Sequence, residues 1–281
     1  MKAQVSYDVR FEWGSAGAAA LAPSSSGLVV VDVLSFSTAV TVAAEGGTRV
    51  FPYSWPDECT AESAAEFAQS HQAQLAVGRR AVSADRPWSL SPTALRRAPF
   101  VPRLVLPSPN GSAICAAAAG GAGAAAAAGA GAADGAGTGA GVGAGSGAGA
   151  GAATVIAGCL RNAAAVGRFL RGSPGPVTVI AAGERWPDGS LRPALEDLLG
   201  AGAILSALGG PGSGVFSPEA EAARACFAAT ADVTAAVSGC ASGRELIEGG
   251  FGDDVAIATE IDACLVVPVV ADGAFTAATG Q

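Results

Sequence analysis

Four times along the chain, a short apolar run leads through a polar turn into a stretch of helical character. The apolar runs are residues 27–33, 103–106, 154–158 and 177–182. The first of them, "GLVVVDV", is apolar almost throughout, which is typical of a parallel strand that is covered on both faces. This repetition predicts an α/β fold, in which a mixed, largely parallel sheet is flanked by helices in strand–loop–helix units.

One segment does not fit this pattern. Residues 116–153 contain thirty-four alanines or glycines in thirty-eight positions. Glycine disfavours a helix by about 1 kcal/mol relative to alanine, so we expect a disordered surface insertion that is dispensable, with a scaffold role as the alternative. We expect one α/β domain over 1–281, or one with two subdomains. Residues 14–26 are predicted to form a loop, and residues 81–102 look irregular.

The composition excludes several classes of function. A net charge of −8 makes nucleic acid a poor partner. The chain contains no run of eighteen large apolar residues, so a membrane span is not expected. The N-terminus has the apolar–polar alternation of a strand and lacks the apolar centre of a signal peptide, so we expect a cytoplasmic protein. Six cysteines without a C-x-x-C pair and a single histidine, His71, argue against zinc and redox sites. The composition is compatible with a homo-oligomer.

Polar loops follow the four predicted strands. They are residues 32–38, 108–112, 159–162 and 184–188. In open α/β sheets, ligands bind beyond the carboxyl ends of the strands. If the strands are neighbours, these loops converge on one crevice.

Carboxylates are concentrated in and near these loops. Asp32 ends the first apolar run, and the stretch "GERWPDGSLRPALED" supplies Glu184, Asp188, Glu196 and Asp197. Their oxygens suit Mg²⁺, which can polarise a phosphoryl group and activate water. We expect Asp32 and Glu184 to be the catalytic pair. For Glu196 and Asp197 the alternative is a structural role, because acids stabilise the first turn of a helix.

Groups that suit anions lie in the same loops. Arg161, Arg185 and Arg192 could clamp a doubly anionic substrate. Two polar turns offer hydroxyls and backbone N–H groups at helix N-termini, where phosphate binds well; they contain Ser35, Ser37 and Thr38, and Asn110, Gly111 and Ser112. Asn162 is also expected to bind the substrate. An ordinary turn is the alternative for Asn110–Gly111, and an N-cap is the alternative for Asn162.

Five motifs in this order resemble the 2-phosphosulfolactate phosphatase family: "VVVDVLSFSTAVTVAAEGG", "PSPNGSA", "VIAGCLRNAAAVGRFL", "GERWPDGSLRPALEDLLGAGAI" and "SGRELIEGGFGDDVAIATEIDACLVVPVV". The resemblance implies an α/β, Mg²⁺-dependent acid phosphatase that converts 2-phospho-3-sulfolactate and water to 3-sulfolactate and phosphate, in coenzyme M synthesis. The positions that match the family motifs are Asp32, Asn110, Gly111, Ser112, Asn162, Glu184, Glu196 and Asp197. Ser35 stands where the family often has arginine.

We therefore expect a Mg²⁺-dependent hydrolase of a small phosphate monoester that bears a second acid group. The substrate is 2-phospho-3-sulfolactate or a related phospho-acid. The alternative is a catalytically silent protein of the same fold that binds small anions, which the serine at position 35 favours.

Overall fold

The computed structural model describes residues 4–54, 61–119, 153–210 and 212–278. Within these ranges, nine strands form one sheet in the order β1-β7-β2-β6-β10-β11-β3-β5-β4, and β8 and β9 form a separate hairpin. The strands are β1 Val9–Trp13, β2 Gly27–Val31, β3 Arg49–Ser54, β4 Gln74–Leu75, β5 Arg103–Ser108, β6 Thr154–Gly158, β7 Val177–Ala181, β8 Glu184–Arg185, β9 Leu191–Arg192, β10 Pro268–Ala271 and β11 Ala274–Ala277. The prediction of a mixed, largely parallel α/β sheet is confirmed.

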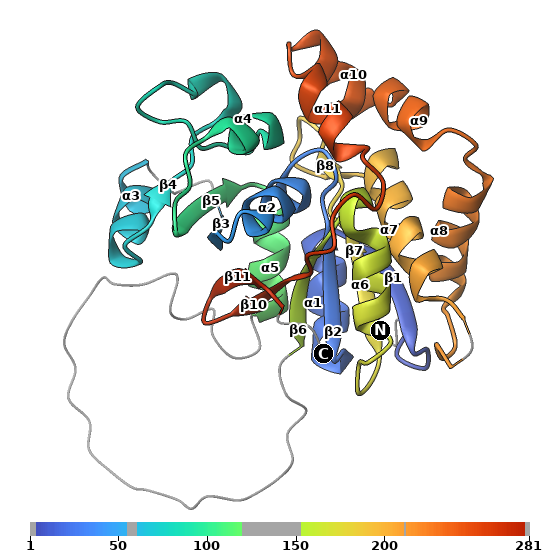
Figure 1. The fold of residues 1–281 in the computed structure, drawn as a ribbon. Coiled ribbons are helices and arrows are strands. Elements are labelled where there is room, and N and C mark those ends of the chain that lie inside the picture. The colour runs from blue at the N-terminus through green and yellow to red at the C-terminus, as the bar shows by residue number, and fades with distance from the viewer. Residues whose placement is uncertain (1–3, 55–60, 120–152, 211, 279–281) are drawn as a thin grey trace, which may run out of the picture.

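Helices surround this sheet (Figure 1). They are α1 Gly14–Leu21, α2 Phe36–Glu45, α3 Ala61–Ser70, α4 Pro92–Arg97, α5 Gly111–Ala119, α6 Ala163–Leu170, α7 Leu195–Leu208, α8 Pro218–Ala229, α9 Val233–Gly239, α10 Ala241–Glu248 and α11 Gly252–Ala258. Short 3₁₀ helices include η1 Ala22–Ser24, η2 Arg79–Ala81 and η4 Leu160–Asn162. Among the described residues, no helix meets the combined demands of length and apolarity that a bilayer span makes.

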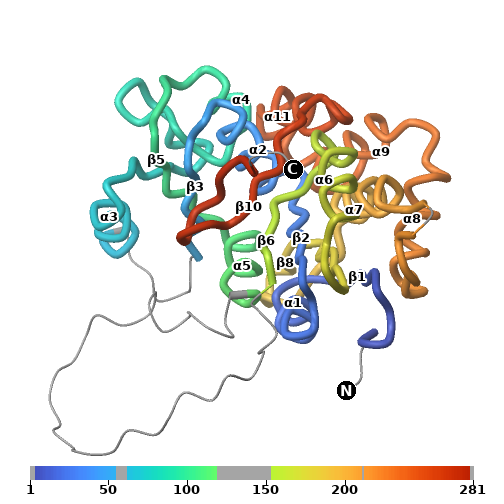
Figure 2. The backbone as a smooth tube through the Cα atoms, turned by 60° about the horizontal axis from the view of Figure 1, so that its bottom comes forward, coloured from blue at the N-terminus to red at the C-terminus, as the bar shows by residue number. Residues whose placement is uncertain are grey.

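The sheet has two parallel halves that run in opposite directions. Strands β1, β7, β2 and β6 pair in parallel, and so do β3, β5 and β4. The antiparallel hairpin β10–β11 lies between them, as Figures 1 and 2 both show. A single residue pair joins the hairpin to each half, Val269 with Ile156 and Phe275 with Val50. The carboxyl ends of the two halves therefore do not share one straight edge.

Strand β2 is buried on both faces, as its unbroken apolar run predicts. Val29 and Val31 contact a core cluster that includes Ile204 of α7. Leu28 and Val30 face a second cluster, which α1, α2 and α5 share with strands of the other half. The central helices thus pack between the two halves of the sheet and hold them together by apolar burial.

Three expectations for local structure are corrected. Residues 14–21 form helix α1 rather than a loop, because its small side chains allow Ala18 and Leu21 to be buried. The region 81–102 contains helix α4, where Ser91 caps the helix by accepting a hydrogen bond from the backbone N–H of Ala94. Helix α5 continues through residues 116–119. The rest of the expected insertion, 120–152, lies outside the described residues.

We predict that replacing residues 120–152 with a short Gly/Ser linker leaves the melting temperature nearly unchanged. Deleting all of 116–153 should lower it by about 3 °C or more, because that change removes the last turn of α5 and its buried Ala118. Thermal denaturation followed by circular dichroism checks both variants. Equal losses in the two variants would contradict the boundary placed at residue 119.

Candidate functional site

A pocket of about 290 Å³ lies at the carboxyl ends of β2, β5 and β7. Its volume is near the lower end of the range for small-molecule sites. Strand-end loops contribute two carboxylates, a hydroxyl and an amide, η2 contributes two arginines, and α10 closes the pocket. These residues are Asp32, Ser35, Asn110, Glu184, Arg79, Arg80, Ser242 and Glu245. Leu90, Leu246 and Phe251 form an apolar wall.

The loops after β5 and β7 meet although their strands are far apart in the sheet. Asn110 Nδ2 donates a hydrogen bond of 3.2 Å to Glu184 Oε2. Asp32 and Glu184 are close enough to influence each other electrostatically. Three of the four predicted loops therefore converge. The loop at 159–162 does not line this pocket.

Asp32 carries an unsatisfied oxygen in a buried position. Its side chain is only 6% exposed, and Oδ2 is buried without a hydrogen-bond partner among the described residues. Burial and the nearby Glu184 carboxylate raise the pKa of Asp32 to about 7, against the backbone N–H of Phe36 and the charge of Arg79, which lower it. A proton or a cation would satisfy this oxygen.

Glu184 is the second acid of the pocket. Burial and the charge of Glu196 raise its pKa, whereas Arg192 and the hydrogen bond from Asn110 oppose that shift. Asp32 and Glu184, two of the three carboxylates that line the pocket, are thus both shifted toward protonation, which marks a candidate functional site.

Asp197 and Glu196 lie in the first turn of helix α7, as expected if their role is to stabilise the start of the helix. Asp197 is buried, and its two oxygens accept hydrogen bonds from the backbone N–H groups of Val33 (2.7 Å) and Gly183 (2.8 Å). Burial and the nearby Asp32 and Glu196 carboxylates raise the pKa of Asp197 well above its ordinary value. Glu196 Oε2 accepts a hydrogen bond from Cys240 Sγ at 3.2 Å.

The predicted group of five metal-binding carboxylates is not assembled. Asp188 is exposed in the turn between β8 and β9, where hydrogen bonds from Ser190 lower its pKa. Asp197 already uses both oxygens on backbone amides. In the described part of the chain, no three His, Cys, Asp or Glu side chains are grouped to share a metal ion. Asp32 and Glu184 are the members that line the pocket.

Four residues expected to cradle phosphate instead stabilise the loops. The buried hydroxyls of Ser37, Thr38 and Ser112 donate to the backbone carbonyls of Val30, Val33 and Leu106, respectively. Gly111 packs against Phe36 so closely that a Cβ at position 111 would lie 2.4 Å from the Phe36 ring, and the position therefore favours glycine. Ser35 does line the pocket, at the N-cap position of α2.

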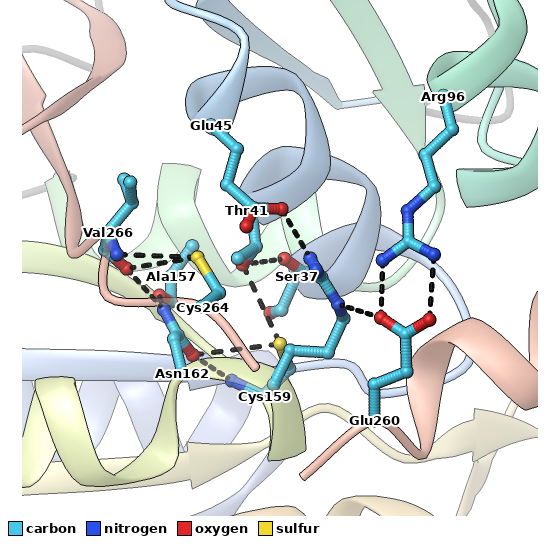
Figure 3. A network of polar contacts seen from close by, with 11 residues as sticks. Ser37, Thr41, Glu45, Arg96, Ala157, Cys159, Asn162, Glu260, Cys264 and Val266 are labelled. Carbon is cyan, nitrogen blue, oxygen red and sulfur yellow. Dashed lines mark hydrogen bonds and ion pairs between the residues drawn. The ribbon is translucent and has the colours of Figure 1, made fainter. Parts of the chain in front are cut away.

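Arg161 and Asn162 are corrections as well. Arg161 is 2% exposed and pairs with Glu45 (Nη1–Oε2, 2.8 Å) and Glu260 (Nε–Oε2, 3.2 Å). Arg96 binds the same Glu260 carboxylate, as Figure 3 shows. Asn162 accepts from the backbone N–H of Cys159 and donates to two backbone carbonyls. Both side chains are structural and are absent from the pocket lining.

Arg185 lies in an adjoining cavity of about 210 Å³ that shares Asn110 and Glu184 with the pocket. It is exposed, and its Nε donates to Asn110 Oδ1 at 3.3 Å. Arg192 approaches the pocket residue Glu245, with Nη2 at 3.9 Å from Oε2.

The sequence reasoning missed Arg79, Arg80, Ser242 and Glu245. Arg79 Nε pairs with Asp254 Oδ2 at 3.0 Å, and its Nη2 donates to the carbonyl oxygen of Leu34. Arg80 is exposed and makes no ion pair with any described residue. Adjacent arginines in a chain that is only 14% charged were the available signal.

Residues 137–273 match the family model described as 2-phosphosulpholactate phosphatase. The match confirms the resemblance over this segment, which contains the last three of the five motifs. That family is a phosphatase family, so the match supports phosphatase activity. The matched segment includes Glu184 and Asp254, but it begins after Asp32 and Asn110 in the sequence. The comparison with curated proteins found no match.

We predict that Arg161→Met lowers the free energy of unfolding by about 1–3 kcal/mol, because it removes a buried cation between two carboxylates. The affinity for inorganic phosphate should not change, since Arg161 does not line the pocket. Chemical denaturation and calorimetry measure the two quantities. The control is Arg97→Met, whose exposed pair with Asp253 should contribute under about 0.5 kcal/mol. Weakened phosphate binding in Arg161→Met would contradict the structural role.

A second prediction concerns pH. The folded state raises the pKa of Asp32 from 3.8 to about 7, so folding binds a proton that the unfolded chain releases. Without divalent cations, this contribution to stability is present below about pH 4 and is lost as the pH rises toward 7. Asp32→Asn should therefore gain stability relative to wild type over this window, reaching about 1–3 kcal/mol at pH 8. Urea denaturation across pH 4–8 tests this, and a difference that stays flat with pH would contradict it.

Proposed function

We propose that this protein hydrolyses a small phosphate monoester that carries a second acid group, with 2-phospho-3-sulfolactate or a related phospho-acid as substrate. The observation that carries the proposal is one pocket in which Asp32 and Glu184 face the cations Arg79 and Arg80. The match to a phosphatase family supports the reaction class. Turnover of 2-phospho-3-sulfolactate would connect the protein to coenzyme M synthesis.

The charge of the pocket favours a divalent cation as cofactor. A phosphate dianion would be repelled by the ionised carboxylates of the pocket unless a cation lies between them and the phosphate. The buried Asp32 Oδ2 without a partner fits such a ligand, and Mg²⁺ typically uses one or two carboxylates together with substrate oxygens. Asp32 and Glu184 would hold the Mg²⁺, which when bound polarises the phosphoryl group and lowers the pKa of water.

The chain's own residues would bind and orient the substrate. Arg79 and Arg80 supply guanidinium donors for the phosphoryl oxygens and for the second acid group. Asn110 holds Glu184 through its 3.2 Å hydrogen bond and so keeps this carboxylate directed at the pocket. The apolar wall of Leu90, Leu246 and Phe251 limits the size of the organic part and excludes water from it.

The test is phosphate release from 2-phospho-3-sulfolactate, 2-phospholactate and ethyl phosphate, each with and without Mg²⁺. We predict Mg²⁺-dependent turnover that prefers the two substrates with a second acid. Asp32→Asn and Glu184→Gln should each reduce kcat/KM by about 100-fold or more, as expected for groups that act on the transition state. The matched control Asp188→Asn, in the exposed turn, should retain activity.

Three outcomes would contradict this proposal. Folded wild-type protein that releases no phosphate from the panel overturns the hydrolase. Tight binding of 2-phospholactate without turnover favours the silent anion-binding protein instead. Full activity in Asp32→Asn or Glu184→Gln would show that the reaction does not take place in this pocket.

A further inference from the structure

The guanidinium of Arg79 is fixed at two of its three nitrogens. Its Nε donates to Asp254 Oδ2 at 3.0 Å, and its Nη2 donates to the carbonyl oxygen of Leu34 in the loop after β2. The third nitrogen, Nη1, makes no hydrogen bond to any residue that the structure describes. Arg79 lines the pocket and also a second cavity of about 350 Å³ beside Asp253 and Asp254. The two N–H donors of Nη1 are the part of the guanidinium that remains for a substrate oxygen.

Asp254 is itself held from several directions. It lies in the first turn of α11, is 2% exposed and does not line the pocket. Its Oδ1 accepts hydrogen bonds from Ser91 Oγ (2.6 Å) and from the backbone N–H of Thr93 (3.1 Å), while Oδ2 accepts from Arg79. A buried carboxylate with both oxygens satisfied has little freedom to move, and therefore transmits its position to the cation that it binds.

We propose that Asp254 is a positioning residue, which fixes Arg79 so that the free edge of its guanidinium binds the phosphoryl group of the substrate. The inference deepens the proposed function and rests on it. Two contacts on one planar group define the orientation of that group, whereas a single contact leaves it free to rotate. A flexible arginine side chain loses rotamer freedom when it binds an anion, which costs conformational entropy. A guanidinium that is already fixed avoids most of this entropic cost.

The residues that hold Asp254 come from the part of the chain around β4 and α4. Ser91 and Thr93 belong to the start of α4, and Arg79 lies in the segment between β4 and α4. Asp254 comes from the C-terminal part of the chain, and Leu34 from the loop after the central strand β2. The Arg79–Asp254 pair thus joins three distant segments at the edge of the pocket.

The experiment is a double-mutant cycle of Asp254→Asn, Arg79→Ala and the double variant. The measured quantities are kcat, KM and the dissociation constant of inorganic phosphate from calorimetry. We expect Asp254→Asn to raise KM and the phosphate dissociation constant about 10- to 100-fold. If Asp254 acts through Arg79, the double variant should bind phosphate no more weakly than Arg79→Ala alone. Independent, additive losses would overturn the proposal.

The matched control is Asp253→Asn, the neighbouring acid on the same helix, which pairs with the exposed Arg97, whereas Arg79 pairs with Asp254. It should leave KM and phosphate binding unchanged; a loss equal to that of Asp254→Asn would overturn the proposal. If Asp254→Asn does not fold, Asp254→Glu takes its place in the cycle, because it keeps the buried charge while displacing the carboxylate.

Failure of this inference is distinguishable from failure of the proposed function. An active wild type with unchanged KM in Asp254→Asn overturns only the positioning role. A wild type that binds phosphate without hydrolysing esters overturns the hydrolase, and the cycle in phosphate affinity still decides the role of Asp254. A wild type that neither hydrolyses esters nor binds phosphate overturns both.

Discussion

The geometry of the pocket depends on the two hydrogen bonds that the buried Asp197 carboxylate accepts. One comes from Val33, just beyond β2, and the other from Gly183, just beyond β7. Asp32 and Glu184 are the residues adjacent to these two donors in the sequence. A single carboxylate from α7 therefore fixes the ends of neighbouring parallel strands and sets the spacing of Asp32 and Glu184 in the pocket.

The second constraint is the reversal of strand direction across the sheet. In a sheet of one direction, the carboxyl end of β5 would lie at the same edge as that of β2, several strands away. Here the halves are opposed, and the β10–β11 hairpin joins each half through one residue pair. The packing of α2 and α5 between the halves then brings Asn110 within hydrogen-bond distance of Glu184. The pocket is thus formed where the two halves face each other, a variant of the usual crevice in α/β proteins.

Local patterns predicted the elements well where one interaction dominates. The apolar run at 27–33 predicted a strand buried on both faces. Asp32 follows this strand in a buried position, where a carboxylate needs a partner or a function. The same reasoning could not distinguish polar side chains that hydrogen-bond to the loop backbone from those that line the pocket. Ser35, Ser37 and Thr38 all carry a hydroxyl, and tertiary packing decides which of these hydroxyls bonds to the backbone and which lines the pocket. Arg161 followed a strand as expected, yet distant Glu45 and Glu260 bind it away from the pocket.

Arg79 shows why the rest of the site was not predictable. Its neighbours Leu34 and Asp254 are 45 and 175 positions away in the sequence, and no local pattern links them. The pocket nevertheless requires such a cation, because Glu184 and Glu196 add negative potential around Asp32. An arginine free to move would fold onto these acids and neutralise them, leaving nothing for an anionic substrate. Holding its Nε on Asp254, outside the pocket, prevents that collapse and keeps the charges of the pocket separated.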